Sequence, residues 1–241
     1  MKIFSIVTIC LGVLLLSACE LPQDSPSAEP FPDIPILPPA PTVVSPAVIG
    51  EYLTDARVAG YDPFDDTQNW NYSSTTGALQ DGTFELNGSA GWQSSFWPKQ
   101  QFKEGQGLVL RFQVKRANAR SEFVFVTGDW LSDSFRQFGV YNAVVPMGDL
   151  FQGRQDMGGY KLTGNLKLES DTWYELLLAV GRNGHFLAVV WNPNDTAQRA
   201  IHDLEAGPNW AGRSWVFLPK ANAGETVLVD DFYRLTLGDV R

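Results

Sequence analysis

From about Tyr52 onward, the sequence is built from short runs in which apolar and polar residues alternate. The run GLVLRFQVK, residues 107–115, follows this pattern, with one apolar face formed by Leu108, Leu110, Phe112 and Val114. A period of two residues places alternate side chains on opposite faces of an extended strand. No stretch of this region repeats apolar residues with the 3.6-residue period of a capped helix. The pattern therefore predicts an all-β fold.

Turn-forming residues divide these runs at short intervals. We expect hairpins between 107–115 and 121–127, between 173–180 and 185–191, and between 214–218 and 226–237. The second contains Asn183-Gly184, a strong hairpin signal because both residues accept the positive φ angles of a tight turn. Weaker strand candidates are residues 83–87, 136–142 and 160–164. Roughly ten or more short strands in about 190 residues are typical of an antiparallel sandwich of two sheets.

Several short motifs in this region also occur together in one group of β-sandwiches. They are Phe64-Asp65-Asp66 followed by Trp70, Asp81-Gly82 before a strand, Thr172-Trp173-Tyr174 leading to Asn183-Gly184, and Val229-Asp230-Asp231-Phe232. Together they resemble the concanavalin A-like, or laminin G-like, jelly-roll group over about residues 60–237. The resemblance implies an antiparallel two-sheet jelly-roll sandwich. Members of the group commonly bind or cleave carbohydrate, and others bind proteins or act as spacers.

The first 18 residues form a short basic and apolar segment that ends at Cys19. Lys2 is followed by about 16 apolar or small residues, which is typical of a secretory signal and short for a spanning helix. The ending Leu16-Ser17-Ala18-Cys19 resembles the bacterial lipobox. The resemblance implies that Cys19 is lipidated at its sulfur and becomes the first residue of the mature chain. A simple cleaved signal and an uncleaved anchor helix are the alternatives.

A lipid on Cys19 would place the protein at the bacterial cell envelope, with the membrane as a partner. Glu20 follows Cys19, where an Asp would resemble a signal for retention at the inner membrane. We therefore expect the outer membrane if the cell has two membranes, and otherwise the outer face of the cytoplasmic membrane.

The segment that follows Cys19 is dominated by proline, and residues 20–48 hold nine of the chain's 15 prolines. Proline fixes φ and lacks an N–H donor, so this composition favours solvated polyproline II structure over a packed core. We expect residues 1–18 to be the signal peptide, 19–51 a disordered linker and 52–241 the jelly-roll domain. A linker of this kind would act as a stalk.

Charge and cysteine content exclude several classes of function. The chain has 18 Lys and Arg against 27 Asp and Glu, a formal net charge of −9. Nucleic-acid binding and electrostatic adhesion to anionic lipid both require clustered basic residues, so neither is expected. Cys10 and Cys19 both precede the predicted domain, which leaves it without a disulfide, a zinc–thiolate cluster or a thiol nucleophile.

The sequence contains one pattern that partly resembles a glucanase motif. Jelly-roll glucanases carry two glutamates with an aspartate between them, and Glu169, Asp171 and Glu175 have a similar order but wider spacing. Residues six apart on one strand lie about 20 Å apart, whereas retaining chemistry needs carboxyl groups about 5 Å apart. We expect Ser170-Asp171-Thr172 to form a turn, and we assign no catalytic residue.

Two acidic pairs are candidates for a structural calcium site. Jelly-roll sandwiches often place their first and last strands side by side, which would bring Asp65 and Asp66 close to Asp230 and Asp231. Four carboxylates repel one another unless a cation or hydrogen bonds stabilise them, and Ca²⁺ prefers such oxygen ligands. The alternative is that these side chains cap strand ends by accepting backbone N–H bonds.

Aromatic residues in loops and at strand ends are candidates for sugar stacking. Exposed aromatic rings bind the apolar faces of sugars, and six residues lie in suitable sequence contexts: Trp92, Trp97, Trp130, Tyr141, Trp191 and Trp210. The alternative is packing in the core or against a protein partner. The sequence therefore favours a lipid-anchored, non-catalytic module that binds a polysaccharide or other glycan. A glycan-active enzyme with an unrecognised site and a structural or protein-interaction module of the envelope stay open.

Overall fold

A computed structural model of the chain describes residues 45–72, 77–87, 96–115, 121–127, 136–142, 151–155, 158–161, 163–205, 210–221 and 225–241. The chain divides into two units, Met1–Leu37 and Pro38–Arg241, and all described residues belong to the second. The predicted signal peptide, Cys19 and most of the predicted linker therefore lie outside the described residues.

The larger sheet of the fold contains nine strands. These are β1 (Arg57–Asp62), β3 (Gly77–Gln80), β4 (Thr83–Asn87), β6 (Gln106–Val114), β11 (Thr163–Gly164), β12 (Trp173–Val180), β13 (His185–Asn192), β14 (Asp195–Glu205) and β16 (Thr226–Thr236). Their order is β11-β14-β13-β12-β6-β16-β4-β3, and β1 also pairs with β16. All of these pairs are antiparallel.

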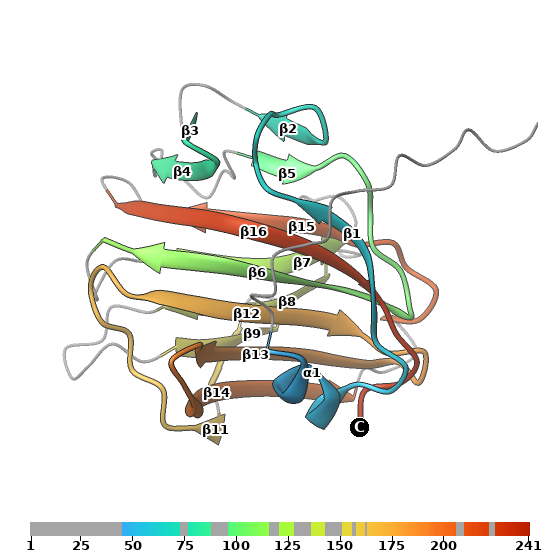
Figure 1. The fold of residues 1–241 in the computed structure, drawn as a ribbon. Coiled ribbons are helices and arrows are strands. Elements are labelled where there is room, and N and C mark those ends of the chain that lie inside the picture. The colour runs from blue at the N-terminus through green and yellow to red at the C-terminus, as the bar shows by residue number, and fades with distance from the viewer. Residues whose placement is uncertain are drawn as a thin grey trace, which may run out of the picture. The chain divides into compact units, whose positions relative to one another are not determined.

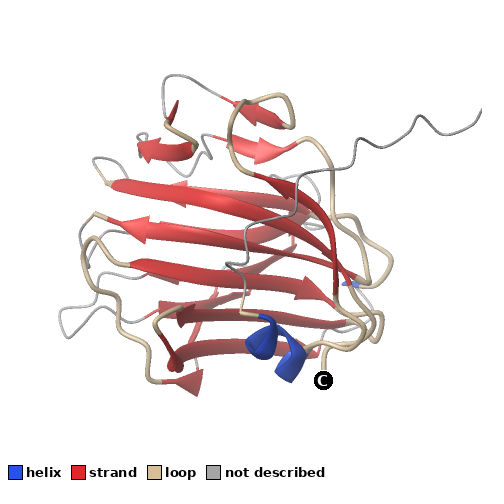
Figure 2. Cartoon of the chain, viewed as in Figure 1, coloured by secondary structure: helices blue, strands red, loops and turns tan. Residues whose placement is uncertain are grey.

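The smaller sheet lies behind the larger one in Figure 1. It contains β7 (Ser121–Thr127), β8 (Arg136–Asn142), β9 (Phe151–Gln155), β10 (Gly158–Lys161) and β15 (Val216–Ala221), in the order β10-β9-β8-β7-β15. A separate two-stranded ribbon is formed by β2 (Trp70–Tyr72) and β5 (Phe96–Pro98). The described residues thus form the predicted antiparallel sandwich, with strands as its dominant element (Figure 2).

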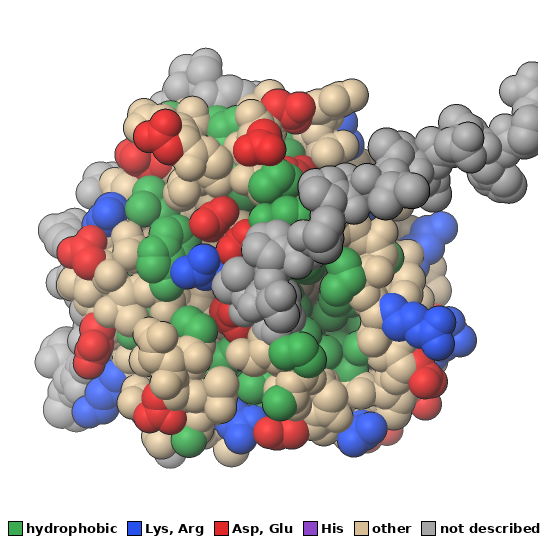
Figure 3. All heavy atoms as spheres, in the orientation of Figure 1, with side chains coloured by type: hydrophobic (Ala, Val, Ile, Leu, Met, Phe, Trp, Pro, Cys, Tyr) green, Lys and Arg blue, Asp and Glu red, His purple; other side chains and the backbone are tan. Residues whose placement is uncertain are grey.

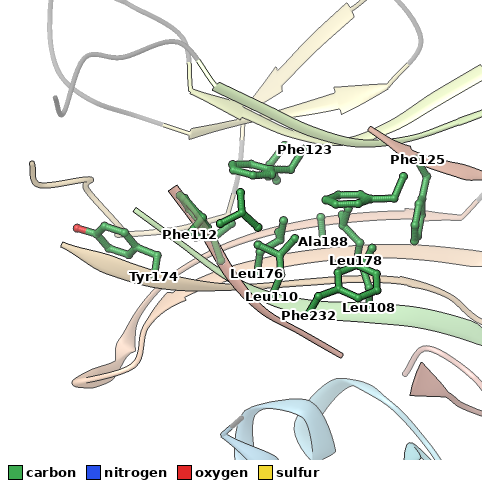
Figure 4. Packing of buried hydrophobic residues seen from close by; sticks show 14 of the residues in the cluster. Leu108, Leu110, Phe112, Phe123, Phe125, Tyr174, Leu176, Leu178, Ala188 and Phe232 are labelled. Atoms are coloured by element: carbon green, nitrogen blue, oxygen red, sulfur yellow. The ribbon is translucent and has the colours of Figure 1, made fainter. Parts of the chain in front are cut away.

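The main core lies between the two sheets and is rich in aromatic rings. Phe112 of β6 and Phe123 of β7 face each other with ring centroids 4.6 Å apart, and both side chains are fully buried. Figure 4 shows these rings meeting from opposite sheets beside Leu110, Leu176 and other buried apolar side chains. Because the core contains no cysteine, packing of this kind holds the sheets together.

The predicted hairpins have different outcomes. The β12–β13 hairpin around Asn183-Gly184 is confirmed, and Gly184 has the positive φ of 79° that the tight turn requires. The other two predictions are wrong, because β6 and β7 lie in different sheets, as do β15 and β16. Their apolar faces pack against each other across the core instead of pairing edge to edge, as the 6.2 Å contact of Phe217 with Phe232 also shows.

A short helix covers part of the outer face of the larger sheet, meaning the face turned away from the smaller sheet. This helix, α1 (Pro46–Tyr52), buries Val48 and Ile49 in a second apolar cluster with residues such as Leu177 and Val189. Figure 1 shows α1 in front of this sheet. Residues 46–51, which the sequence analysis assigned to the linker, thus belong to the folded unit. Nothing among the described helices has both the length and the apolar character needed to cross a bilayer.

The first and last strands of the sandwich are neighbours, as expected. In the β1–β16 pair, Tyr61 lies opposite Tyr233 and Asp62 lies opposite Phe232. The register of β16 against β6 shifts between Asp230 and Tyr233, which marks a bulge. Asp231 lies in this bulge with a φ of 49°. The bulge separates the part of β16 that pairs with β4 from the part that pairs with β1, and it directs carboxylates onto the outer face.

Candidate functional site

A pocket of about 270 Å³ lies where β1, β2, β5 and β16 meet. The ring of Tyr61 points to the outer face of the larger sheet, beside Tyr233, so Tyr61 borders the pocket through its backbone. The main polar lining residues of the pocket are Asp62, Asn69, Lys99, Gln100 and Arg234. Trp70 and Phe232 line it as well, and both side chains are almost fully buried. The pocket therefore combines a rigid apolar base with several polar side chains, the usual make-up of a small-molecule site.

Asp62 is held firmly within the pocket wall. Its Oδ1 accepts a hydrogen bond from the backbone N–H of Phe64 at 2.9 Å. Its Oδ2 accepts bonds from the indole N–H of Trp70 at 2.8 Å and from the amide of Asn69 at 3.2 Å. Three donors thus share the negative charge and fix the orientation of the carboxylate.

Two cationic side chains also line the pocket. Nζ of Lys99 donates to the carbonyl of Gln68 at 2.7 Å. The Arg234 guanidinium donates to the carbonyl groups of Gln100 and Gln101 at 3.2 and 2.9 Å. It also lies 4.1 Å from the ring centroid of Phe102, a cation–π contact. Burial lowers the pKa of Arg234 to about 10, so the guanidinium remains charged at neutral pH.

A charged network adjoins the pocket through Tyr61. The Tyr61 hydroxyl donates to Oδ1 of Asp231 at 2.7 Å, and Nη1 of Arg111 donates to Oδ2 of Asp231 at 3.1 Å. Arg111 also lies 5.0 Å from the ring centroid of Trp173. Figure 3 looks onto this outer face, where acidic and basic side chains lie next to each other among apolar ones. We call Tyr61, Arg111, Trp173, Glu175 and Asp231 the outer-face network.

Glu175 is the most buried member of the outer-face network, with 1% of its surface exposed. It lies opposite Arg111 on one neighbouring strand and opposite Trp191 on the other. Oε2 accepts a 3.4 Å hydrogen bond from the hydroxyl of Ser45, which directly precedes α1. Burial raises the pKa of Glu175, and the hydrogen bond from Ser45, the nearby indole of Trp191 and the charge of Arg111 oppose this rise.

The predicted calcium site does not form among the described residues. Asp65 and Asp66 are exposed, and Oδ1 of Asp66 accepts the backbone N–H of Gln68 at 2.7 Å. Asp231 instead pairs with Arg111, and Oδ1 of Asp230 accepts the backbone N–H of Asp231 at 2.7 Å. Within the described part of the chain, no three His, Cys, Asp or Glu side chains are grouped as metal ligands. The adjacency of β1 and β16 was correct, but hydrogen bonds and Arg111 stabilise the carboxylates of β16.

Two of the aromatic candidates are core residues, so the prediction that they are exposed is wrong. Trp191 is fully buried on the outer face of the larger sheet, where Val48 and Ile49 of α1 belong to the same cluster. Trp210 is 7% exposed and stacks on Trp215 in the main core, with ring centroids 5.4 Å apart. Neither ring offers a face to a ligand.

Two other candidates are half-buried, and both belong to the smaller sheet's side of the molecule. Trp97 of β5 packs against an apolar cluster of Val124, Val126 and Leu218. Tyr141 of β8 lies opposite Glu122. Trp92 and Trp130 lie outside the described residues, so their prediction as stacking residues is untested.

The residues that line the pocket were not predicted as site residues from the sequence. Asp62 lies just before the motif Phe64-Asp65-Asp66. Its position next to Pro63 was the only local sign that it could belong to a binding site. Trp173 begins an apolar strand, yet its side chain is half-buried on the outer face beside Arg111. Glu175 alternates with Trp173 along β12, so a period of two places both on the same face. The predicted turn at residues 170–172 is confirmed, since β12 begins at Trp173.

No protein-family model and no curated protein matches the sequence. Solved structures do match the fold. The carbohydrate recognition domain of Emp47p aligns over 78% of this chain and 98% of its own, with 13% identity and a TM-score of 0.50. A laminarinase from Flavobacterium sp. UMI-01 covers 75% of this chain and 100% of its own, with 9% identity and a TM-score of 0.52. A galectin-like protein of unknown function from Bacillus subtilis covers 77% and 99%, with 13% identity and a TM-score of 0.54.

The chain has a concanavalin A-like jelly-roll fold. Identities of 9–13% support the architecture alone, because this fold carries both lectins and glycoside hydrolases. The function must therefore be argued from the pocket and from the outer-face network.

Proposed function

We propose that this protein is a non-catalytic carbohydrate-binding module, held at the bacterial cell envelope by a lipid on Cys19. The observation that carries the proposal is the pocket, in which Trp70 and Phe232 form an apolar base beside fixed polar groups such as Asp62. Sugars offer an apolar ring face and a rim of hydroxyl groups. A pocket that pairs an apolar aromatic base with oriented donors and acceptors is suited to both surfaces.

The state of Asp62 favours binding over catalysis. Glycoside hydrolysis normally uses two carboxyl groups about 5–10 Å apart, one as acid and one as base or nucleophile. Asp62 is the only carboxylate among the described lining residues, and both of its oxygens accept hydrogen bonds from the protein. Such a carboxylate can orient a sugar hydroxyl through a remaining lone pair, but it has no partner within the pocket for acid–base chemistry.

A glycan-active enzyme is the second candidate, and the outer-face network is the observation that favours it. Burial raises the pKa of Glu175 while Asp231 is paired with Arg111, and glycosidase sites also place two carboxyl groups in different environments. Glu175 is nearly inaccessible, however, and Ser45 covers its Oε2. Release of reducing sugar that is abolished by Glu175→Gln would establish this alternative over the first.

The pocket can be tested by filling it without changing any polar group. Gly60 lines the pocket, and a Cβ at this position would meet only Cβ of Arg234, at an ordinary 3.9 Å. Gly60→Leu should therefore fold and occupy the space of a sugar. Gly50→Leu on α1 is the matched control, since a Cβ there contacts nothing within 4 Å and lies away from the pocket.

The chain from Pro38 to Arg241 contains the whole folded unit with both apolar clusters, so we expect it to fold alone. On a glycan array, this chain and its Gly50→Leu variant should bind the same sugars, while Gly60→Leu should lose at least roughly ten-fold in affinity. A clean negative of the parent chain across common polysaccharides would overturn the proposal and favour a structural or protein-interaction role.

The envelope anchor is a separate part of the proposal and has its own test. The lipobox-like ending at Cys19 and the proline-rich segment after it support a lipidated module on a stalk. The full chain should incorporate a labelled fatty acid and fractionate with membranes, and Cys19→Ser should abolish the incorporation of the label. Equal labelling of both forms would contradict lipid attachment at Cys19.

A further inference from the structure

We propose that the pocket selects an acidic sugar, a unit that carries a carboxylate or a sulfate group. This inference rests on the proposed carbohydrate-binding function and specifies the ligand class of the same pocket. It is drawn from the balance of charge and of hydrogen bonds among the lining residues.

The lining has an excess of positive charge that is unusual for this chain. The chain as a whole carries a formal net charge of −9, yet the charged lining residues are Lys99, Arg234 and one carboxylate, Asp62. The local balance is therefore opposite in sign to that of the protein. A positive pocket in a negative protein attracts anions locally while the remaining surface does not.

Asp62 does not neutralise the two cations. Its oxygens are occupied by the N–H groups of Phe64, Asn69 and Trp70. The hydrogen bonds of Lys99 and Arg234 go to main-chain carbonyl groups, and neither cation forms an ion pair within the described residues. Carbonyl dipoles orient a guanidinium but remove none of its charge.

Arg234 is the better placed of the two to bind an anion. Two carbonyl bonds and the stacking contact with Phe102 hold the guanidinium in one orientation, so little freedom is lost when an anion binds. An anion would also stabilise the buried cation, whose lowered pKa reflects lost hydration. Carboxylate and sulfate groups both match the donor geometry of a guanidinium.

The remaining lining indicates a sugar body rather than a bare ion. Asn69 and Gln100 have amide groups, and the apolar base of the pocket is formed by Trp70 and Phe232, whose ring centroids lie 4.8 Å apart. These groups extend the site beyond the reach of one small anion. At about 270 Å³, the pocket is at the lower end of ligand sites and fits a single acidic sugar, free or at the end of a chain.

The test compares matched acidic and neutral sugars on the Pro38–Arg241 chain. Galacturonate and galactose trisaccharides differ in the carboxylate groups, and a 6-sulfated galactose oligosaccharide provides the sulfate form. Binding is measured by calorimetry and by the NMR shift of the Trp70 indole N–H, which donates to Asp62 in the pocket wall. We expect at least one acidic form to bind roughly ten-fold tighter than the neutral one in low salt. The relative affinities of the two acidic forms identify the group.

Two substitutions assign the preference to this pocket. Lys99→Gln, at an exposed position, should reduce the acidic-to-neutral affinity ratio by roughly three-fold. Arg234→Lys keeps the charge but loses the planar donor pair, and should reduce it by roughly ten-fold. Arg57→Gln removes one positive charge from the exposed start of β1, outside the pocket, and should leave the ratio unchanged.

Each outcome decides the inference. Equal or tighter binding of the neutral sugar with a shift at Trp70 overturns the acidic preference and leaves the carbohydrate-binding function intact. An acidic preference that Arg57→Gln reduces as much as Lys99→Gln overturns it too, since general charge would then be responsible. No binding of any sugar to a folded chain overturns both proposals. A preference for the acidic sugar that falls at high salt and with Lys99→Gln supports the inference.

Discussion

The hydroxyl group of Tyr61 donates a 2.7 Å hydrogen bond to Asp231, and this contact joins the first strand of the sandwich to the last. The same carboxylate accepts a bond from Arg111 of β6, so it connects three strands that are distant in sequence. Burial is the main cause that raises the pKa of Tyr61, and the bond to Asp231 adds to it. The phenol therefore remains a donor at neutral pH and holds the pocket wall against the outer-face network.

The first prediction concerns the charge of Asp231. Asn at this position keeps an acceptor for Tyr61 and tolerates the positive φ of 49°, but it removes the charge that pairs with Arg111. Because the carboxylate is 9% exposed and the guanidinium 25%, we expect Asp231→Asn to lower the free energy of unfolding by about 1–3 kcal/mol. Urea denaturation measures the change.

An exposed ion pair provides the control for this substitution. Asp171 lies 3.4 Å from Lys115, with side-chain exposures of 66% and 45%, and its φ of 55° also suits Asn. Asp171→Asn should change the stability by less than about 0.5 kcal/mol, because exposed pairs are screened. Equal effects of the two substitutions on stability would contradict the prediction that the buried ion pair of Asp231 with Arg111 stabilises the fold.

The second prediction is a pH dependence that comes from Glu175. Burial raises its pKa above the ordinary value of 4.5, so the folded chain binds this proton more tightly than the unfolded chain does. The resulting stability is complete below pH 4.5 and is lost as the pH rises through the folded pKa. Glu175→Gln cannot titrate and should therefore lose less stability over this pH range.

The measurement is the difference between the stability curves of the parent chain and Glu175→Gln from about pH 4 to pH 8. Asp230 and His202 titrate in both proteins, so their contributions cancel in the difference. A constant difference across this range would mean that Glu175 has the same pKa in the folded and unfolded chains, which would contradict the raised pKa.

The third prediction separates core tryptophans from ligand-binding residues. Trp210 stacks on Trp215 and contacts Phe186, with ring centroids 5.1 Å apart. Trp210→Ala should lower the free energy of unfolding by about 3–5 kcal/mol through cavity formation. Any sugar affinity should be unchanged while the protein remains folded, and a selective loss of affinity would return Trp210 to the list of binding residues.

The fourth prediction tests the boundary of the folded unit. Ile49 of α1 is 7% exposed and packs on the larger sheet, whereas Val58 of β1 is 55% exposed. Ile49→Ala should reduce the stability by about 2 kcal/mol, and Val58→Ala by less than about 0.5 kcal/mol. Equal, small effects would show that α1 is dispensable and that the domain starts near residue 52, as its composition indicates.

Alternation and turn chemistry allowed the strands to be predicted with useful accuracy. The runs 107–115, 121–127 and 173–180 all correspond to observed strands, because an amphipathic period is a local property. Helix α1 was missed because it is seven residues long and lies at the end of a proline-rich segment. A helix of about two turns with two buried residues has too few periods to be recognised.

The pairing of strands was harder to predict than the strands themselves. Alternation reports which face of a strand is buried but not whether its partner lies beside it or across the core. β6 and β7 show the difference, since Phe112 and Phe123 satisfy their apolar faces by meeting across the sandwich. Asn183-Gly184 succeeded because a four-residue turn, residues 181–184, leaves room only for an adjacent strand.

The sequence by itself determined the class of fold, the position of most strands and the absence of cysteine chemistry from the domain, because each depends on local pattern or composition. Only the tertiary structure decided which tryptophans are buried and which polar residues meet. Trp191 is covered by α1, and Asp62 is joined to Trp70 and Arg234 in one pocket. Such contacts depend on the order of the strands and on the bulge at Asp231. Both arise when the whole chain packs, so the residues that form the contacts carry no local sequence pattern that predicts them.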